Sequence, residues 1–292
     1  MTESIKTVAV IGAGTMGSGI ATVAARGGQR TILFDQSAEG LKRGTDFVRG
    51  FLQKSVKLGK MTETDAANAE ARLVSTTDIR DLRDADIVIE AVFEDLSAKK
   101  DLFAQLDDIV SPQALLHTNT STLSVTAIAS GSRHPERVVG THYCNPAPLM
   151  KLVEVVDGLH TADWARKATL DYLTTVGKTS VQVKDRPGFI LNRFLIPWEN
   201  SCINALENGL ATKEAIDAAV PGALGHPMGP FQLLDIVGLD IHLQVATRLY
   251  EQLKEPRFAA PPLVERMIAA GDLGRKTGRG FYTYDDTSLF GA

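Results

Sequence analysis

Short apolar runs alternate with helical patterns along the first 185 residues. The runs are rich in Val, Ile and Leu, as in strands that are buried on both faces. We expect strands at residues 6–11, 31–34, 73–75, 87–90, 115–117, 138–140 and 181–183. Helical patterns separate them, at residues 17–25, 37–71 (two helices, broken near Gly59), 97–110, 125–130 and 162–176. This alternation predicts an α/β fold with a doubly wound, largely parallel sheet and helices on both faces.

The pattern changes after Asp185-Arg186-Pro187-Gly188, where we place a domain boundary. From Phe189 onward the expected helices are residues 192–206, 213–219, 231–253 and 263–270, and one strand-like run follows at 281–284. The segment 231–253 is apolar over much of its circumference, as in helices that a partner subunit covers. We therefore expect two domains, 1–185 and 186–292, of which the second is all-α and forms a homodimer.

A glycine-rich turn follows the first expected strand and precedes a helix. It reads Gly12-Ala13-Gly14-Thr15-Met16-Gly17. In Rossmann-type folds the first glycine permits the tight turn, the second lets the backbone approach a pyrophosphate, and the third lets the helix pack closely. Asp35 ends the next strand, where a carboxylate holds the ribose 2′-hydroxyl and repels a 2′-phosphate. The N-terminal domain is therefore predicted to be Rossmann-type and to bind NAD rather than NADP.

Polar residues follow several of the other expected strands, namely Glu90 to Glu94, Thr118 to Ser121, and His142. Because ligands bind at the carboxyl ends of the strands in such sheets, these residues are expected to converge on one site. The stretch Asn119-Thr120-Ser121-Thr122 has two compatible interpretations. It can cap the next helix, and it can present hydroxyl groups to a substrate.

An imidazole and a carboxylate, His142 and Glu154, stand at opposite ends of a short apolar run that contains two prolines. A turn at Asn145-Pro146-Ala147-Pro148, between two strand-like segments, would fold them back toward each other. A histidine oriented by a carboxylate is the arrangement of a general base. Either residue alone is more often structural, so the pair does not establish a catalytic site by itself. The remaining histidines lack a comparable partner and are expected to be structural: His117, His134, His160, His226 and His242.

Several cations lie among the charged positions of residues 37–71: Arg43, Arg49, Lys54, Lys57 and Lys60. Two interpretations stay open. Such cations most often form a solvated helix face, and they also suit the docking of a ligand that carries several phosphates.

Composition narrows the class of protein. The 292 residues are 44% hydrophobic and 23% charged, which is enough for well-buried cores. The formal net charge of −4 argues against a general nucleic-acid-binding protein. Neither an apolar run of about eighteen residues nor a secretory signal pattern is present, so we expect no membrane span and a cytoplasmic location. Two cysteines, Cys144 and Cys202, give no basis for a disulfide framework or a zinc site, and no metal is expected.

In combination, the motifs resemble those of the L-3-hydroxyacyl-CoA dehydrogenase family, and especially of its short bacterial members, the 3-hydroxybutyryl-CoA dehydrogenases. The resemblance runs nearly end to end. It rests on Gly12 to Gly17, Asn119-Thr120-Ser121, His142 with Asn145-Pro146, Leu152-Val153-Glu154, Pro187 to Arg193, His226 to Pro230, and Lys276 to Tyr282.

The resemblance implies NAD-linked oxidation of a (3S)-3-hydroxyacyl-CoA, of short chain length, to the 3-oxoacyl-CoA, and the reverse reduction. It implies that His142 is the general acid/base, that Glu154 orients it, and that Ser121 and Asn192 bind the substrate oxygens. Further contacts are implied for the cofactor and for the coenzyme A part of the substrate. The cofactor contacts are Glu94, Lys99, Asn145 and Lys276, and the coenzyme A contact is Lys57, with Lys60 as the alternative lysine.

The sequence also departs from the family pattern. Tyr143-Cys144 stands where many relatives have two phenylalanines, Thr122 where a second serine is common, and Phe51 near the position of a serine that contacts coenzyme A. These departures leave the acyl-chain preference and the coenzyme A contacts open. Two other functions stay open as well: an NAD-dependent dehydrogenase of a free 3-hydroxy acid, and an NAD-binding structural or sensor protein without turnover.

Overall fold

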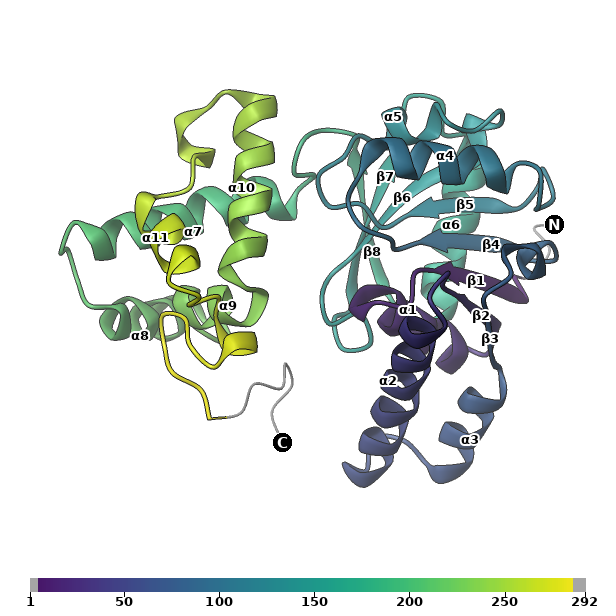
Figure 1. Cartoon of the computed structure of the whole chain (residues 1–292), viewed down its shortest axis with the longest axis horizontal. Helices are drawn as coiled ribbons and strands as arrows, with labels where there is room; N and C mark the ends of the chain where they lie inside the picture. The colour runs from purple at the N-terminus through teal and green to yellow at the C-terminus, as the bar shows by residue number, and fades with distance from the viewer. Residues whose placement is uncertain (1–4, 286–292) are drawn as a thin grey trace. The chain divides into compact units, whose positions relative to one another are not determined.

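A computed structural model describes residues 5–285 of the chain (Figure 1). The chain divides into two compact units between Phe189 and Ile190. The first unit contains the whole β-sheet, and the second is built from helices. No helix in the described part of the chain is both long and apolar enough to cross a membrane.

An eight-stranded sheet forms the centre of the first unit, in the order β3-β2-β1-β4-β5-β6-β7-β8. Its neighbouring strands are parallel except β6 and β7, which are antiparallel. The strands are β1 (Thr7–Ile11), β2 (Arg30–Phe34), β3 (Leu73–Thr76), β4 (Ile87–Glu90), β5 (Leu115–Thr118), β6 (Val138–Tyr143), β7 (Leu152–Asp157) and β8 (Thr179–Lys184). The order β3-β2-β1-β4 reverses direction at β1, so β1 and β4 flank the switch point at which such sheets bind ligands.

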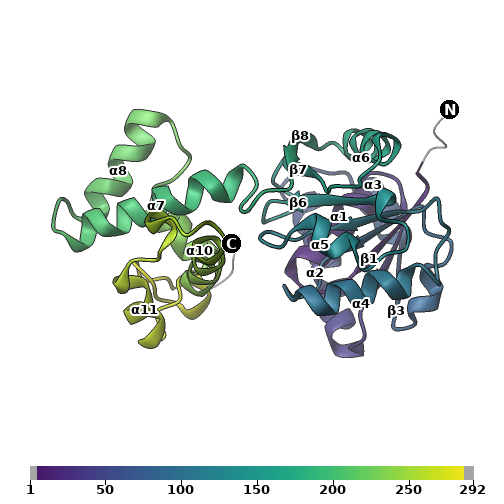
Figure 2. The same cartoon turned by 90° about the horizontal axis from the view of Figure 1, so that it is seen from above.

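The helices of the first unit cover both faces of the sheet. They are α1 (Thr15–Arg26), α2 (Ala38–Lys57), α3 (Glu63–Ala71), α4 (Leu96–Leu106), α5 (Val125–Ala129) and α6 (Asp163–Thr175), with 3₁₀ helices η1 (Ile79–Leu82) and η2 (Pro135–Arg137). Figure 2 shows α6 and α4 on opposite sides of the sheet. The expected doubly wound fold is therefore confirmed.

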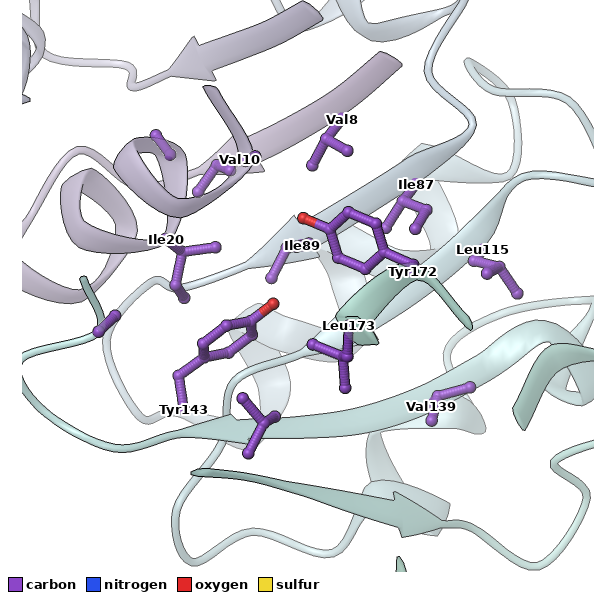
Figure 3. Close-up of a cluster of buried hydrophobic side chains, with 14 of the residues drawn as sticks. Val8, Val10, Ile20, Ile87, Ile89, Leu115, Val139, Tyr143, Tyr172 and Leu173 are labelled. Atoms are coloured by element: carbon purple, nitrogen blue, oxygen red, sulfur yellow. The ribbon is translucent and has the colours of Figure 1, made fainter. Parts of the chain in front are cut away.

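Alternation along the buried strands produces one hydrophobic core on each face. Val8 and Val10 of β1 pack with α1 and α6, whereas Ala9 and Ile11 pack with α4 and α5. Successive side chains of a strand point to opposite faces, so a strand that is apolar at every position must be covered on both. Figure 3 shows the first of these cores, in which the buried rings of Tyr143 and Tyr172 lie among aliphatic side chains.

The turn between β1 and α1 depends on its glycines. Gly12 has φ +98°, a conformation that disfavours residues with a side chain. A Cβ atom on Gly12 would lie 2.7 Å from the Ala91 carbonyl oxygen, and one on Gly17 would lie 1.8 Å from the Gly12 carbonyl oxygen. Only glycine therefore allows β1, the start of α1 and the end of β4 to approach this closely.

The second unit consists of α7 (Leu191–Glu207), α8 (Lys213–Leu224), α9 (Pro230–Val237), α10 (Leu239–Leu253) and α11 (Pro262–Ala269), with η3 (Pro256–Phe258) and η4 (Arg275–Thr277). The expectation of one helix over 231–253 was wrong. Gly238, with φ +102°, ends α9 and starts α10. The core of this unit gathers Ile203, Phe231, Leu234 and Leu239 around Phe281.

The strand expected at 281–284 was also wrong, because this segment forms only an isolated bridge, between Arg279 and Thr283. The backbone N–H groups of Phe281 and Tyr282 donate instead to the carboxylate of Asp235 in α9, both at 2.8 Å. A buried carboxylate thus takes the place of a neighbouring strand as hydrogen-bond acceptor.

Candidate active site

The imidazole of His142 and the carboxylate of Glu154 face each other across two antiparallel strands. His142 in β6 and Glu154 in β7 are register partners, and His142 Nδ1 lies 2.7 Å from Glu154 Oε2. Both side chains are buried. The connecting turn contains a cis peptide bond between Asn145 and Pro146. The two residues therefore lie together, as the sequence predicted, because the turn joins two paired strands.

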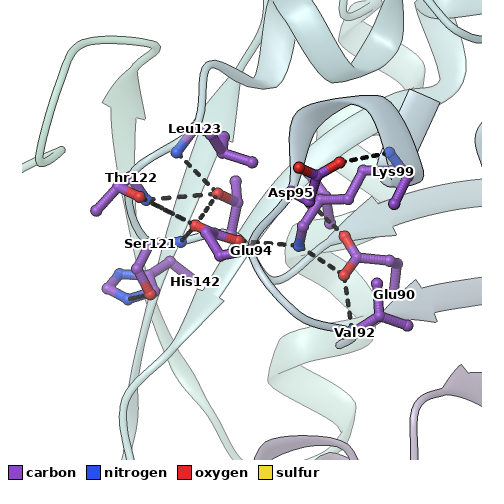
Figure 4. A network of polar contacts seen from close by, with 12 residues as sticks. Glu90, Val92, Glu94, Asp95, Lys99, Ser121, Thr122, Leu123 and His142 are labelled. Carbon is purple, nitrogen blue, oxygen red and sulfur yellow. Dashed lines mark hydrogen bonds and ion pairs between the residues drawn. The ribbon is translucent and has the colours of Figure 1, made fainter. Parts of the chain in front are cut away.

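The second nitrogen of His142 meets Ser121. Ser121 Oγ lies 3.1 Å from His142 Nε2 (Figure 4). A carboxylate only accepts hydrogen bonds, so the contact with Glu154 assigns the proton to Nδ1. Nε2 is then the basic nitrogen, and it faces the side on which Ser121 lies.

Glu94 holds the loop that carries Ser121. Glu94 Oε1 accepts from Thr120 Oγ1 at 2.5 Å, from Ser121 N at 2.9 Å and from Thr122 N at 3.1 Å. Burial alone would raise the pKa of Glu94, but the ammonium of Lys99 and the hydrogen bonds from Thr120 and Ser121 outweigh burial and lower it. Glu94 is therefore an ionised acceptor that fixes the position of the Ser121 loop.

The glycine turn and Asp35 lie side by side at the ends of β1 and β2. Asp35 Oδ2 accepts from Ala13 N at 2.8 Å, and Asp35 Oδ1 accepts from Ser37 N at 2.9 Å. The N-terminus of α1, which starts at Thr15, has neither a capping side chain nor an acidic residue in its first turn. Uncapped N–H groups at a helix N-terminus suit a phosphate group, so these residues fit a dinucleotide.

Two family models cover almost the whole chain. The model described as "3-hydroxyacyl-CoA dehydrogenase, NAD binding domain" matches residues 7–186. The model described as "3-hydroxyacyl-CoA dehydrogenase, C-terminal domain" matches residues 188–284. The chain belongs to the 3-hydroxyacyl-CoA dehydrogenase family. It is an NAD-dependent oxidoreductase that converts 3-hydroxyacyl-CoA to 3-oxoacyl-CoA, as the sequence resemblance implied.

Named relatives and solved structures agree with this family. A 3-hydroxybutyryl-CoA dehydrogenase of Mycobacterium tuberculosis is 44% identical over 97% of this chain and 100% of its own length. A 3-hydroxyadipyl-CoA dehydrogenase of Escherichia coli is also 44% identical, over 97% of this chain and 60% of its own length. The crystal structure of M. tuberculosis FadB2 has a TM-score of 0.94 at 43% identity and covers 97% of this chain and 100% of that one.

Within this dehydrogenase, Lys99 has a buried position. Its side chain is 1% exposed, and Lys99 Nζ lies 2.6 Å from Glu90 Oε1 and 3.0 Å from Glu94 Oε2 (Figure 4). The ammonium is thus enclosed by two carboxylates. The contact of Lys99 with the cofactor remains a prediction. In this structure its ammonium contacts Glu90 and Glu94, and Glu94 in turn holds the Ser121 loop.

The other predicted site residues lie on separate elements of the two units. Asn145 is exposed in the turn that follows β6, and Lys57 is exposed in the last turn of α2. Asn192 and Lys276 belong to the second unit. Asn192 lies in the first turn of α7, and Lys276 Nζ lies 2.6 Å from both carboxylate oxygens of Asp240.

Cys144, the departure near His142, follows the last residue of β6. Burial and the neighbouring charge of Glu154 raise the pKa of the Cys144 thiol, against a smaller opposite effect of Lys178. A thiol with a raised pKa stays protonated near neutral pH and is a poor nucleophile. Cys144 is therefore a half-buried, unreactive thiol rather than a nucleophile.

Phe189 was not predicted to contact the site, and Glu90 was predicted only as one of the polar residues that converge on it, without its partner. Phe189 packs its ring 5.7 Å from the ring of His142, and Glu90 binds Lys99. A signal for Glu90 was present, because a carboxylate ending an otherwise apolar buried strand needs a partner. Phe189 had no such signal, since its contact joins segments that lie far apart in the sequence.

Proposed function

We propose that His142 is the general acid/base of this dehydrogenase and that its preferred substrate is a short-chain (3S)-3-hydroxyacyl-CoA such as 3-hydroxybutyryl-CoA. One observation carries the assignment of His142. Its Nδ1 is held by the buried Glu154 carboxylate while its Nε2 faces Ser121. The short-chain preference is supported by the relatives named 3-hydroxybutyryl-CoA dehydrogenase, which are 44% and 41% identical. A relative named 3-hydroxyadipyl-CoA dehydrogenase is also 44% identical, so the chain-length series below includes longer thioesters.

The residues around His142 provide what the oxidation requires. NAD, when bound, supplies the acceptor for the hydride that leaves C3 of the substrate. His142 Nε2 takes the proton of the 3-hydroxyl group, and Glu154 stabilises the resulting imidazolium at Nδ1. Ser121 Oγ holds the substrate oxygen in line with Nε2. In the reduction the imidazolium returns its proton to the carbonyl oxygen.

The remaining contacts are assigned by family resemblance. Asn192 is the second substrate donor, and Lys57 binds the coenzyme A part. Asn145 and Lys276 contact the cofactor. Lys57 is exposed in the last turn of α2, and its positive charge suits the binding of the phosphate groups of coenzyme A.

We further propose a homodimer that forms through the helical domain, residues 186–292, and a cytoplasmic location. The homodimer is supported by apolar side chains on the surface of the second unit. Phe194 of α7 is 71% exposed, and Ile241 and Tyr250 of α10 are 43% and 40% exposed. Exposed apolar side chains of this size are typical of a surface that another chain covers.

Substitution of His142 by Gln tests the assignment of the base. Without an imidazole the rate constant kcat should fall roughly 100- to 10,000-fold while NADH binding, measured by fluorescence titration, persists. His134→Gln is the matched control, because His134 is half-exposed at the N-cap of η2 and its imidazole pairs with Glu136. Full activity in His142→Gln would refute the assigned base.

The substrate is tested by NADH oxidation with 3-oxoacyl-CoA thioesters of increasing chain length, with free acetoacetate and with NADPH as controls. We expect the highest kcat/KM with acetoacetyl-CoA. A higher kcat/KM with the free acid would point to a dehydrogenase of free 3-hydroxy acids. A preference for NADPH would contradict the role of Asp35, and NADH binding without turnover of any substrate would indicate a sensor protein.

A further inference from the structure

Glu90 is a charged residue in the centre of the sheet. It is the last residue of β4 and is 0% exposed, with Ile11 of β1 and Thr118 of β5 as its register partners. A carboxylate in this position is costly unless it is fully hydrogen-bonded and paired with a cation. The hydrogen-bond and ion-pair partners of Glu90 therefore indicate what this carboxylate does.

Both oxygens of Glu90 are used. Oε1 accepts from Lys99 Nζ at 2.6 Å and from Val92 N at 2.8 Å, and Oε2 accepts from Thr118 Oγ1 at 2.7 Å. The bond to Val92 fixes the turn that begins at Ala91. The Ala91 carbonyl oxygen is the atom that a Cβ on Gly12 would approach to 2.7 Å. Glu90 thus supports the segment on which the glycine turn of the NAD site rests.

Lys99 continues these contacts toward the Ser121 loop. Its ammonium lies between Glu90 Oε1 at 2.6 Å and Glu94 Oε2 at 3.0 Å. The other oxygen of Glu94 accepts from Thr120, Ser121 and Thr122. Figure 4 shows the resulting series of contacts, from the Val92 turn through Glu90, Lys99 and Glu94 to Ser121 and His142.

We propose that Glu90 is a positioning residue, which acts through Lys99 and Glu94 to hold Ser121 against His142 and which also holds the Ala91–Val92 turn against the glycine turn. Glu90 touches neither His142 nor Ser121. Its role is to keep the ammonium of Lys99 between two carboxylates, so that Glu94 remains directed at the Ser121 loop. The inference rests on the proposed roles of His142 and Ser121.

Charge balance gives this proposal a specific signature. Glu90, Lys99 and Glu94 together carry two negative charges and one positive charge. Lys99→Met leaves two carboxylates facing each other at short distance, and their repulsion displaces Glu94 from the Ser121 loop. Glu90→Gln leaves Lys99 with Glu94 as its only anionic partner in this cluster and draws Glu94 toward it. The double variant restores the original net charge without the repulsion.

The test compares Glu90→Gln, Lys99→Met and the double variant in the full-length enzyme, with kcat and KM for acetoacetyl-CoA and the Kd of NADH measured for each. We expect kcat to fall about 10- to 100-fold in Lys99→Met and about tenfold in Glu90→Gln, since small displacements of a reacting group cost this much. Addition of Glu90→Gln to Lys99→Met should raise kcat at least about threefold. The Kd of NADH should rise several-fold in Glu90→Gln, because the Val92 turn loosens.

Asp107→Asn is the matched control. Asp107 forms a buried ion pair with Arg137 at 2.5 Å, away from the proposed site residues, and both side chains are 0% exposed. This variant should lower the melting temperature and leave kcat and the NADH Kd within about twofold of wild type. If the Glu90 and Lys99 variants change only the melting temperature, or if the double variant is as slow as Lys99→Met, the proposal is wrong. A fully active His142→Gln would instead remove the proposed function on which it rests.

Discussion

Phe189 holds a backbone conformation that is uncommon for a residue with a large side chain. Its φ is +49°, directly after Gly188 with φ +78°, and its ring is buried against His142. Such a conformation persists only where the surrounding packing stabilises it. The backbone conformation of Phe189 thus places its ring 5.7 Å from the His142 ring, tilted by 57°.

His117 provides a pH-dependent test at the residue scale. Its burial in β5 lowers its pKa from 6.5 to about 3, and the structure describes no hydrogen-bond partner for its Nδ1. The unfolded chain takes up a proton as the pH falls through 6.5, whereas folded His117 does not until about pH 3. The stability that this residue contributes is therefore lost as the pH falls from 6.5 toward 3, by up to about 1.4 kcal/mol per pH unit.

The free energy of unfolding of His117→Gln should accordingly fall less steeply than that of wild type between pH 6.5 and 4.5. Urea denaturation across this range measures the slope. His160→Gln serves as control, because His160 is exposed and should leave the slope of wild type unchanged. Parallel curves for wild type and His117→Gln would show that His117 is protonated in the folded protein.

The sequence predicted most of the proposed site residues, but it did not predict the contacts that hold them in place. The glycine turn, Asp35, Ser121, His142 and Glu154 stand at positions where a sheet of this type binds ligands, so sequence order was enough to propose them. Glu90 and Phe189 act through contacts that depend on tertiary packing. The enclosure of Lys99 between two carboxylates was unpredictable for the same reason.

At the scale of elements, the approach of α1 to β1 is the most tightly constrained contact near the predicted site. Gly17 lies in the first turn of α1, directly against the Gly12 carbonyl group. The first turn of this helix would also carry the phosphate-binding N–H groups. We therefore expect the position of α1 to affect both packing and cofactor binding.

Gly17→Ala should push α1 away from the glycine turn. We expect a loss of about 1–3 kcal/mol in the free energy of unfolding, as for overpacked sites, and a rise of at least about tenfold in the Kd of NADH. Gly50→Ala is the control, since no atom lies within 4 Å of a Cβ placed on Gly50 of α2. That variant should be as stable as wild type or slightly more so. Equal NADH affinity in both variants would contradict the close approach at Gly17.

Most elements could be predicted from periodicity, and the two errors have different physical causes. Gly238 divides the helix predicted over 231–253 into two because its φ is +102°. The hydrophobic pattern of this segment gives no information about that backbone angle. The segment 281–284 has the composition of a strand, but its N–H groups find Asp235 rather than a neighbouring strand. In both cases a local backbone or a distant acceptor overrode the pattern.

At the scale of the whole molecule, each hydrophobic core consists of residues from one unit only. The cores around β1 and around the α2–α3 pair use only residues up to Phe189, and the cores of the helical unit use only residues from Ile196 onward. A unit with its own core can fold independently. The sequence boundary at Asp185 to Gly188 lies close to the division at Phe189–Ile190.

A fragment of residues 1–189 should therefore fold and bind NADH with a Kd within about tenfold of the full-length value, but should show no turnover, because Asn192 and the helical unit are missing. Circular dichroism and NADH fluorescence titration test the first part, and acetoacetyl-CoA reduction tests the second. An unfolded fragment would mean that the second unit is needed for the stability of the first. Turnover by the fragment would exclude an essential role of Asn192.

The pairing of His142 with Glu154 has a consequence for how this enzyme can diversify. Because the two residues are register partners in adjacent strands, the sheet holds their geometry and the turn between them does not. Leu149 and Met150, which are 48% and 41% exposed in this turn, are then open to substitutions that leave the pair intact. Library mutagenesis confined to these two positions should keep turnover close to that of wild type.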